Sequence, residues 1–261
     1  MKRVLAFLLA VLLCLPLMGC GGGAAQNDNI LGKWVMIGEE GYVKFFENGT
    51  AEMVDGVTFD FSWKYDAEAG NYRANIGGRR VTFTIETEEG VTYLSGLGYF
   101  FREEDLPAAR RATGAIRKNQ IQRQLEGKNL LPLGEEIALD GVSLRFEEIF
   151  LADEKRSVKV RVSVTAELDM SAEELEGLLS IAKYHYFYED LRSLSSGSAW
   201  RVELGLAGLA AGESAQAEFL LCSNRDFAEL MEENGRLDGY AVISLGGTEY
   251  YVDLGTYTAR K

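Results

Sequence analysis

Few residues of this sequence have side chains that could carry out covalent chemistry. The chain holds one histidine, His185, and three cysteines, Cys14, Cys20 and Cys222. Serine and cysteine hydrolases need a histidine that activates a nucleophile, but His185 lies in an aromatic, strand-like run and the chain has no nucleophile-elbow motif. We therefore expect His185 to serve packing or to lie at the surface. Zinc sites need clusters of histidine or cysteine, so the sequence predicts no metal site and no cofactor.

Two further patterns imitate catalytic motifs. Ser180-Ile181-Ala182-Lys183 matches S-x-x-K, the nucleophile motif of penicillin-interacting enzymes, but its companions S-D-N and K-T-G are missing. The match also joins an expected helix end to an expected strand, so we interpret it as chance. Neighbouring acids such as Glu39-Glu40, Glu88-Glu89 and Glu232-Glu233 fall in expected turns or on helix faces, where solvation explains them. A hydrolase that uses loop carboxylates is therefore the least favoured function, and we predict no catalytic residues.

The cysteine in the most informative context is Cys20. Met1-Lys2-Arg3 gives a basic start, Val4 to Leu17 is apolar, and Leu17-Met18-Gly19-Cys20 is followed by three glycines. A basic start before a short apolar run predicts a secretory signal, because the run is too short for a spanning helix. The alternative is an ordinary secretory peptide cut elsewhere, with Cys20 as a bystander.

This terminus resembles a bacterial lipoprotein signal with its lipobox. The resemblance implies cleavage between Gly19 and Cys20 and a diacylglyceryl group on the Cys20 sulfur. Each buried CH₂ group contributes about 0.8 kcal/mol, so two acyl chains hold a protein to a membrane where one would not. The expected location is therefore extracytoplasmic, with a lipid anchor in the cell membrane.

The net charge and the number of cysteines limit the partners and the cellular compartment that we expect. The formal net charge is −13, and removal of the signal, which carries Lys2 and Arg3 but no acid, leaves −15. Nucleic acids and acidic lipids both require a basic footprint, so neither is an expected partner. Cys222 remains the only other cysteine outside the signal, which rules out an internal disulfide and favours a Gram-positive surface over a periplasm.

Residues 30–105 alternate between apolar and polar side chains and are divided by turn dipeptides such as Asn48-Gly49 and Asp55-Gly56. The clearest strand is expected over 58–66, where every second side chain is aromatic. Short antiparallel strands with one apolar face close most easily into a small meander barrel. The strands are expected over residues 33–37, 42–46, 58–66, 72–76, 80–86, 91–95 and 99–102.

Leu31-Gly32-Lys33-Trp34 resembles the G-x-W signature of lipocalin-like domains, and Phe101-Arg102 resembles the position whose basic residue packs over that tryptophan in the family. The resemblance implies a lipocalin-like barrel that could carry a small apolar ligand. Small barrels are more often filled by their own side chains. The aromatic residues expected to fill this one are Trp34, Phe59, Phe61, Trp63, Tyr65 and Phe83.

Residues 106–128 change to helical composition after Pro107, and we expect one helix over 108–126 that ends at Gly127. The helix is the one basic segment of an acidic chain. A solvated connector that docks on its two neighbouring domains explains this charge better than nucleic acid does, because no aromatic residues are interleaved. The basic residues are Arg110, Arg111, Arg117, Lys118, Arg123 and Lys128.

Residues 129–261 return to longer alternating strands, with short helices expected from the capping box at Ser171 to Leu179 and from Arg225 to Asn234. Long strands with varied loops favour a two-sheet sandwich. Leu133-Gly134-Glu135-Glu136 with Val142-Ser143-Leu144, and the later segment 209–214 that leads to Phe219, resemble immunoglobulin-like extracellular domains of Gram-positive lipoproteins. Strands are expected over residues 135–139, 142–151, 157–168, 181–189, 199–206, 214–222, 240–245 and 248–254.

One strand offers a candidate partner-binding surface. Alternation over 181–189 places Tyr184, Tyr186 and Tyr188 on one face and Ile181, Lys183, His185 and Phe187 on the other. If the second face points inward, the tyrosines form an exposed row suited to protein recognition. In the favoured alternative the tyrosines are core residues, because burying the Lys183 ammonium would be far more costly than exposing Ile181.

The sequence thus predicts a mainly β protein, with a small antiparallel meander barrel, a helical connector and a β-sandwich that has two short helices. We expect a lipid-anchored, non-catalytic binding or interaction module whose partner is an unknown protein or a small apolar ligand. A ligand carrier or sensor is the first alternative. The expected divisions are 1–19 for the signal, 20–29 for a flexible tether, 30–105 for the barrel, 106–128 for the connector and 129–261 for the sandwich.

Overall fold

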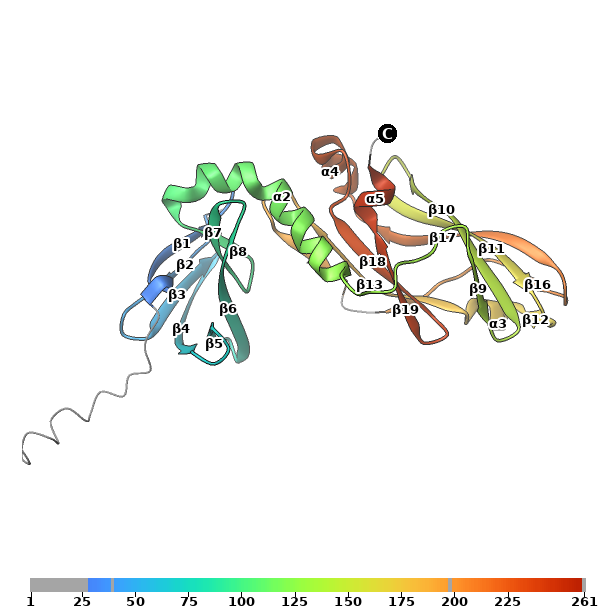
Figure 1. Cartoon of the computed structure of the whole chain (residues 1–261), viewed down its shortest axis with the longest axis horizontal. Coiled ribbons are helices and arrows are strands. Elements are labelled where there is room, and N and C mark those ends of the chain that lie inside the picture. Colours follow the sequence, from blue (N-terminus) through green and yellow to red (C-terminus); the bar gives the residue numbers. More distant parts are fainter. Residues whose placement is uncertain (1–27, 39, 197–198, 260–261) are drawn as a thin grey trace, which may run out of the picture. The chain divides into compact units, whose positions relative to one another are not determined.

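A computed structural model describes residues 28–38, 40–196 and 199–259 (Figure 1). The predicted acylation site, Cys20, lies outside these residues. The chain divides into two compact units, the first made of Met1–Glu86 and Thr92–Glu103, the second of Thr87–Val91 and Glu104–Lys261. Of the helices that the structure describes, none has both the length and the apolar character needed to cross a bilayer.

Eight antiparallel strands follow one another around a closed barrel, which belongs to the first unit except for Thr87–Val91, where β6 ends and β7 begins. The predicted meander is confirmed, and the structure adds one strand, β3, that the sequence had not indicated. Asn48-Gly49, with a φ of +80° at the glycine, forms the predicted turn before this strand. The strands are β1 (Gly32–Met36), β2 (Tyr42–Phe45), β3 (Thr50–Asp55), β4 (Val57–Asp66), β5 (Asn71–Ile76), β6 (Arg79–Glu88), β7 (Val91–Ser95) and β8 (Tyr99–Phe101).

The barrel interior is occupied by aromatic side chains in mutual contact. The Phe45 ring lies 5.5 Å from that of Phe83 and 5.8 Å from that of Trp63 between ring centroids, both edge to face. The expectation that every aromatic residue of β4 would face this interior is only partly right. Phe61 and Trp63 are buried, but Phe59 is 39% exposed. It lies in the first part of β4, where all four residues are exposed.

The residues of the G-x-W signature contact one another, the start of the barrel and Arg102. Trp34 donates its indole N–H to the carbonyl of Ile30 at 2.7 Å, and the Arg102 guanidinium lies 3.8 Å from the centre of the indole ring. Arg102 also donates to the carbonyl of Asn29 at 2.9 Å, in the short 3₁₀ helix η2 (Asp28–Ile30). Gly32 has a φ of +95°, and a Cβ there would lie 2.9 Å from Nη1 of Arg102. The basic residue therefore packs over the tryptophan as the resemblance implied.

The second unit is a sandwich of two antiparallel sheets. One sheet has the order β17–β11–β10–β9 and the other β14–β13–β18–β19, with β15 also paired to β13. With β10 as strand A, these orders are E-B-A and C′-C-F-G, the immunoglobulin-like arrangement, in which β9 lies beside strand A. The strands are β9 (Glu136–Leu139), β10 (Val142–Ala152), β11 (Ser157–Ala166), β13 (Leu179–Phe187), β14 (Ser193–Ser195), β15 (Trp200–Arg201), β17 (Ser214–Ser223), β18 (Gly239–Leu245) and β19 (Thr248–Asp253).

Between the sheets lies an aliphatic core to which β11 contributes Val158, Val160, Val162 and Val164, all with no exposed surface. The expectation that these four valines share one face is confirmed. A small two-stranded ladder of β12 (Met170–Ser171) and β16 (Gly208–Leu209) lies apart from the two main sheets.

The short helices begin and end largely where capping chemistry predicts. Ser171 caps α3 (Ala172–Glu176) in a reciprocal capping box with Glu174, as the sequence indicated. The helix α4 (Phe227–Asn234) ends at Gly235, whose φ is +71°. A helix that the sequence did not predict, α5 (Leu254–Thr258), follows β19, because the Asp253 side chain accepts from the N–H groups of Gly255 and Thr256.

The long helix α2 (Leu106–Leu125) belongs to the second unit and is more than a solvated connector. Its Ile116 and Ile121 are buried, and so is Arg117, whose Nε donates to a carboxylate oxygen of Asp238 at 2.9 Å. The basic residues of the segment therefore fall into two groups, one buried and one exposed. Arg117 fixes the helix to the sandwich, whereas Arg110, Arg111 and Lys118 are exposed.

Candidate functional site

The tyrosines proposed as an exposed row belong to the sandwich core. Tyr186 has no exposed surface, and Tyr184 and Tyr188 are partly buried against the same cluster. The hydroxyl of Tyr186 accepts from the Asn224 amide, and that of Tyr188 donates to Asp226 at 3.1 Å. Burial raises the pKa of Tyr186, with the neighbouring Tyr188 hydroxyl adding to the effect. The exposed-row interpretation is wrong, and the alternative with the tyrosines inside describes the structure.

Strict alternation failed along β13 because the strand contains a bulge. Ile181 is opposite Ile243, but Lys183 is opposite Val242, so Ala182 is the extra residue. The bulge changes the phase of the side chains. Ile181 therefore lies in the same core as Tyr184 and Tyr186, although the sequence had placed it on the opposite face.

His185 lies on the other face of β13 and packs against aromatic rings. Its ring centroid is 4.8 Å from that of Phe187 and 5.5 Å from that of Tyr240, which stacks on it. Burial lowers the pKa of His185, and the charge of Lys183 lowers it further. This environment favours the neutral imidazole. His185 therefore packs against neighbouring rings, as the sequence analysis expected for a packing role.

The remaining candidate nucleophiles are poorly placed for chemistry. Cys222 is buried in the sandwich core, and burial raises the pKa of its thiol to about 12, which suppresses the reactive thiolate. Ser180 and Lys183 both lie on β13, without the helix end that the sequence suggested. At roughly 3.3 Å per residue they are about 10 Å apart along the strand, too far for Lys183 to deprotonate Ser180. No group of metal-binding side chains occurs within residues 28–38, 40–196 and 199–259.

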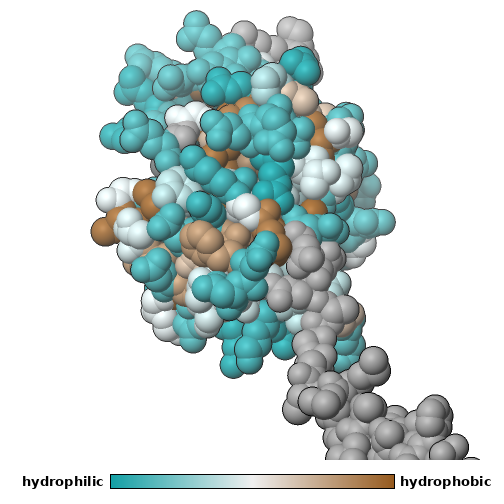
Figure 2. Space-filling model, turned by 90° about the vertical axis from the view of Figure 1, so that its left-hand side faces the viewer, coloured by the Kyte–Doolittle hydropathy of each residue, from teal (hydrophilic) through white to brown (hydrophobic). Residues whose placement is uncertain are grey.

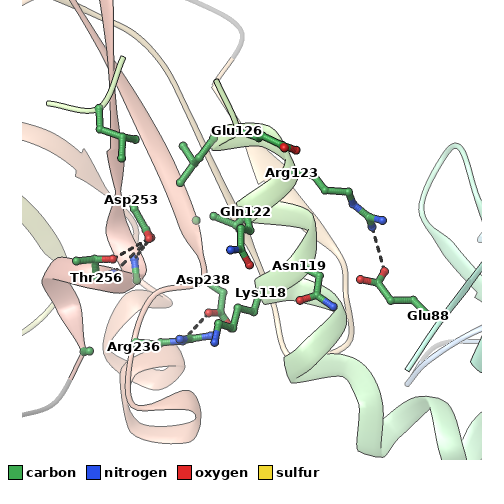
Figure 3. Close-up of a pocket in the computed structure, with 16 residues that line it drawn as sticks. Glu88, Lys118, Asn119, Gln122, Arg123, Glu126, Arg236, Asp238, Asp253 and Thr256 are labelled. Carbon is green, nitrogen blue, oxygen red and sulfur yellow. Dashed lines mark hydrogen bonds and ion pairs between the residues drawn. The ribbon is translucent and has the colours of Figure 1, made fainter. Parts of the chain in front are cut away.

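The second unit contains a cleft of about 920 Å³ that the sequence analysis did not anticipate (Figure 3). The helix α2 forms one wall, and residues near the start of β18 and in α5 form the other. The cleft combines charged, amide and apolar side chains. Its lining residues from these parts are Lys118, Asn119, Ile121, Gln122, Arg123, Leu125, Glu126, Leu130, Arg236, Asp238, Gly239, Asp253, Gly255, Thr256 and Ala259, together with Glu88 of the Thr87–Val91 segment.

At one end of the cleft is a buried carboxylate held by two arginines. The side chain of Asp238 is 5% exposed, and its two oxygens pair with Nε of Arg117 at 2.9 Å and with Nε of Arg236 at 2.7 Å. Arg117 donates further to the carbonyl of Glu189 and to the side chain of Asn234. This network compensates the charge of Asp238 and fixes α2 against the residues that precede β18.

Two other charged groups of the cleft also have partners within the second unit. Asp253 uses both carboxylate oxygens to cap α5, accepting from the N–H of Gly255 at 2.9 Å and from the hydroxyl of Thr256 at 2.7 Å (Figure 3). Arg123 pairs with Glu88 at 3.0 Å.

Two charges remain available to a ligand. Lys118 and Glu126 are both exposed, and neither side chain has an ion-pair partner in the described part of the chain. Figure 3 shows Lys118 and Arg236 at one end of the cleft and Glu126 at the other. The cleft is therefore positive at one end and negative at the opposite end.

The described part of the barrel exposes a few large apolar side chains. Val57 and Phe59 of β4 are 63% and 39% exposed, and Leu97 is 49% exposed. The side of the molecule in Figure 2 is mostly hydrophilic, with hydrophobic side chains in small groups. A few exposed apolar residues are normal on folded proteins, so we assign no role to them.

The chain matches no protein-family model, and no curated protein matches it. Among solved structures, it is similar to the crystal structure of an uncharacterised β-sandwich protein from Clostridium difficile 630. The two chains are 12% identical, the alignment covers 49% of this chain and 94% of the other, and the TM-score is 0.32.

Proposed function

We propose that this protein is an extracytoplasmic lipoprotein, anchored to the cell membrane through Cys20, that acts by binding a partner and not by catalysis. The anchor is supported by the basic start, the apolar run and Leu17-Met18-Gly19-Cys20. The absence of a possible internal disulfide favours a Gram-positive surface.

The observation that carries the binding function is the cleft of the second unit. Its volume of about 920 Å³ lies within the range of roughly 300–1,000 Å³ that is usual for ligand sites. The fixed network of Arg117, Asp238 and Arg236 holds its walls together, so the site is formed before a ligand arrives.

Binding is better supported than hydrolysis because the potential nucleophiles lie elsewhere. The thiol of Cys222 is in the core, and His185 is enclosed by Phe187 and Tyr240. The cleft itself contains carboxylates, but Asp238 and Asp253 are fully engaged by arginines and by a helix N-terminus. A carrier function of the barrel is less supported, since contacting aromatic rings occupy its interior.

A variant with a bulky side chain in the cleft tests the binding function. Gln122 lines the cleft, whereas Gln124 is exposed on the same helix outside it. We expect a partner from the native envelope to be retained by the parent protein and by Gln124→Trp but lost from Gln122→Trp. Equal retention by the two tryptophan variants would show that the partner does not use the cleft.

Membrane fractionation tests the anchor. Cys20→Ala should remove the acylation site, so the variant should leave the membrane fraction or remain unprocessed with a larger apparent mass. Fractionation and migration identical to those of the parent would contradict the anchor.

A further inference from the structure

We infer that the cleft of the second unit binds a short zwitterionic peptide, with its carboxylate beside Lys118 and Arg236 and its ammonium group beside Glu126. This inference rests on the proposed binding function and names the class of ligand for the same site.

The positive end of the cleft suits a carboxylate. The Lys118 ammonium is exposed and has no ion-pair partner among the described residues. Arg236 uses Nε for Asp238, and its side chain remains 33% exposed, which leaves the outer side of the guanidinium for a ligand. Charge-assisted hydrogen bonds from these two groups are the strong type that fixes a free carboxylate.

The opposite end suits an ammonium group. Glu126 follows the last residue of α2, and its carboxylate is exposed without an ion-pair partner in the described part of the chain. The last carbonyl groups of a helix carry a partial negative charge, which adds to that of the carboxylate. A positive ligand group is therefore favoured at this end for two reasons.

Other lining residues of the cleft suit a peptide backbone with small side chains. Leu125, Leu130 and Ala259 provide apolar surface, and Leu130 is 56% exposed. Gln122 lies on α2 between the two charged ends and can both donate to and accept from a peptide group. The hydroxyl of Thr256 donates to Asp253 and keeps its capacity to accept.

The spacing of the two ends sets the length of the peptide. Lys118 and Glu126 are eight positions apart on α2, a rise of about 12 Å along the helix axis at roughly 1.5 Å per residue. An extended peptide rises about 3.3 Å per residue, so three or four residues bridge this distance. Peptides of that length with free ends match both the separation and the order of the charges.

Calorimetric titration of the full chain in mild detergent tests this inference with three probes. The probes are tetra-alanine with free ends, its C-terminal amide and its N-acetyl derivative. Because each modification removes one charge, we expect each to weaken binding about tenfold, which corresponds to about 1.4 kcal/mol. Lys118→Gln should reduce the penalty for amidation and leave that for acetylation unchanged, because Arg236 still contacts the carboxylate. Glu126→Gln should reduce the penalty for acetylation and leave that for amidation unchanged.

Arg110→Gln is the matched control, because Arg110 is exposed on α2 outside the cleft. It should leave both penalties unchanged. The inference is overturned if the three probes bind equally, if none binds saturably, or if Lys118→Gln keeps the full penalty for amidation. If the inference is overturned but Gln122→Trp loses the envelope partner, the cleft binds a different ligand and the proposed function stands. If both experiments fail, the cleft is not a binding site.

Discussion

At the scale of single residues, the buried pair of Arg117 and Asp238 fixes α2 against the residues that precede β18. Arg117 is visible as one of several basic residues in a helical segment, but its partner is 121 positions away. No local pattern distinguishes a buried arginine from the exposed Arg110 and Arg111. The cleft was missed for the same reason, since its walls come from residues 118–130 and 236–259 and meet only in the folded unit.

Arg117→Met should strongly destabilise the second unit. Among the described residues, the change leaves the buried Asp238 paired with Arg236 alone, and removal of one member of a buried pair costs about 3–5 kcal/mol. Urea unfolding followed by circular dichroism measures the loss. Arg110→Met, which alters an exposed arginine of the same helix, should change the free energy of unfolding by less than about 0.5 kcal/mol. Equal effects of the two substitutions would contradict the role of the pair.

Gly32→Ala should destabilise the barrel by about 1–3 kcal/mol, because a Cβ would strain a φ of +95° and meet Nη1 of Arg102 at 2.9 Å. Gly70→Ala provides the comparison, since Gly70 has a φ of +64° but no atom within 4 Å of its added Cβ. Thermal unfolding should show the larger loss for Gly32→Ala. A larger loss for Gly70→Ala would mean that the contact with Arg102 is unimportant.

The environment of His185 predicts a dependence of stability on pH. Its pKa is lowered in the folded state, so below pH 6.5 the unfolded chain binds more protons at this site than the folded chain does. The free energy of unfolding should therefore fall as the pH decreases from 7 through 6.5, until the folded pKa is reached. His185→Phe should flatten this part of the profile, measured by urea unfolding between pH 7 and 5. If the pH profile of the variant keeps this slope, the pH dependence of stability comes from other titratable groups.

At the scale of elements, periodicity and capping predicted most of the structure. The meander, the valine face of β11, the capping box at Ser171 and the stop at Gly235 follow from local patterns, and the structure confirms them. The predictions that failed did so because of a β-bulge and a helix cap, which periodicity does not reveal. The bulge at Ala182 inverts the phase of β13, and Asp253 starts α5 where alternation had continued a strand.

Deletion of Ala182 should be better tolerated than deletion of a residue from a regular strand. Ala182 is the extra residue of the bulge, so its deletion leaves Ile181 and Tyr184 two positions apart, and a regular strand keeps both on the core face of β13. We expect cooperative unfolding of the second unit to be retained in differential scanning calorimetry. Deletion of Ser163 from β11 is the comparison, because it would turn part of the valine row away from the core and should abolish the cooperative transition. A deletion of Ala182 that abolishes the transition as completely as the deletion of Ser163 would contradict the role of Ala182 as the extra residue.

At the scale of the whole molecule, the chain separates into two compact units, and we propose that each folds by itself. The helix α2 decides where a fragment must begin, because it supplies Arg117 to the sandwich. A fragment of residues 104–261 should therefore melt at a higher temperature than one of residues 129–261, in which Asp238 lacks this partner. Similar melting temperatures would show that α2 is dispensable for the second unit.

The most direct test of the central claim, that the cleft is the binding site of an anchored protein, is photo-crosslinking in the native envelope. A photoreactive amino acid at position 122 lies in the cleft, and one at position 218 replaces Glu218, which lies on the sandwich strand β17 outside the cleft. We predict a discrete adduct from position 122, none from position 218, and loss of the adduct when Thr256→Trp fills the opposite wall. The same adduct from both positions, or its persistence in the Thr256→Trp variant, would contradict the claim.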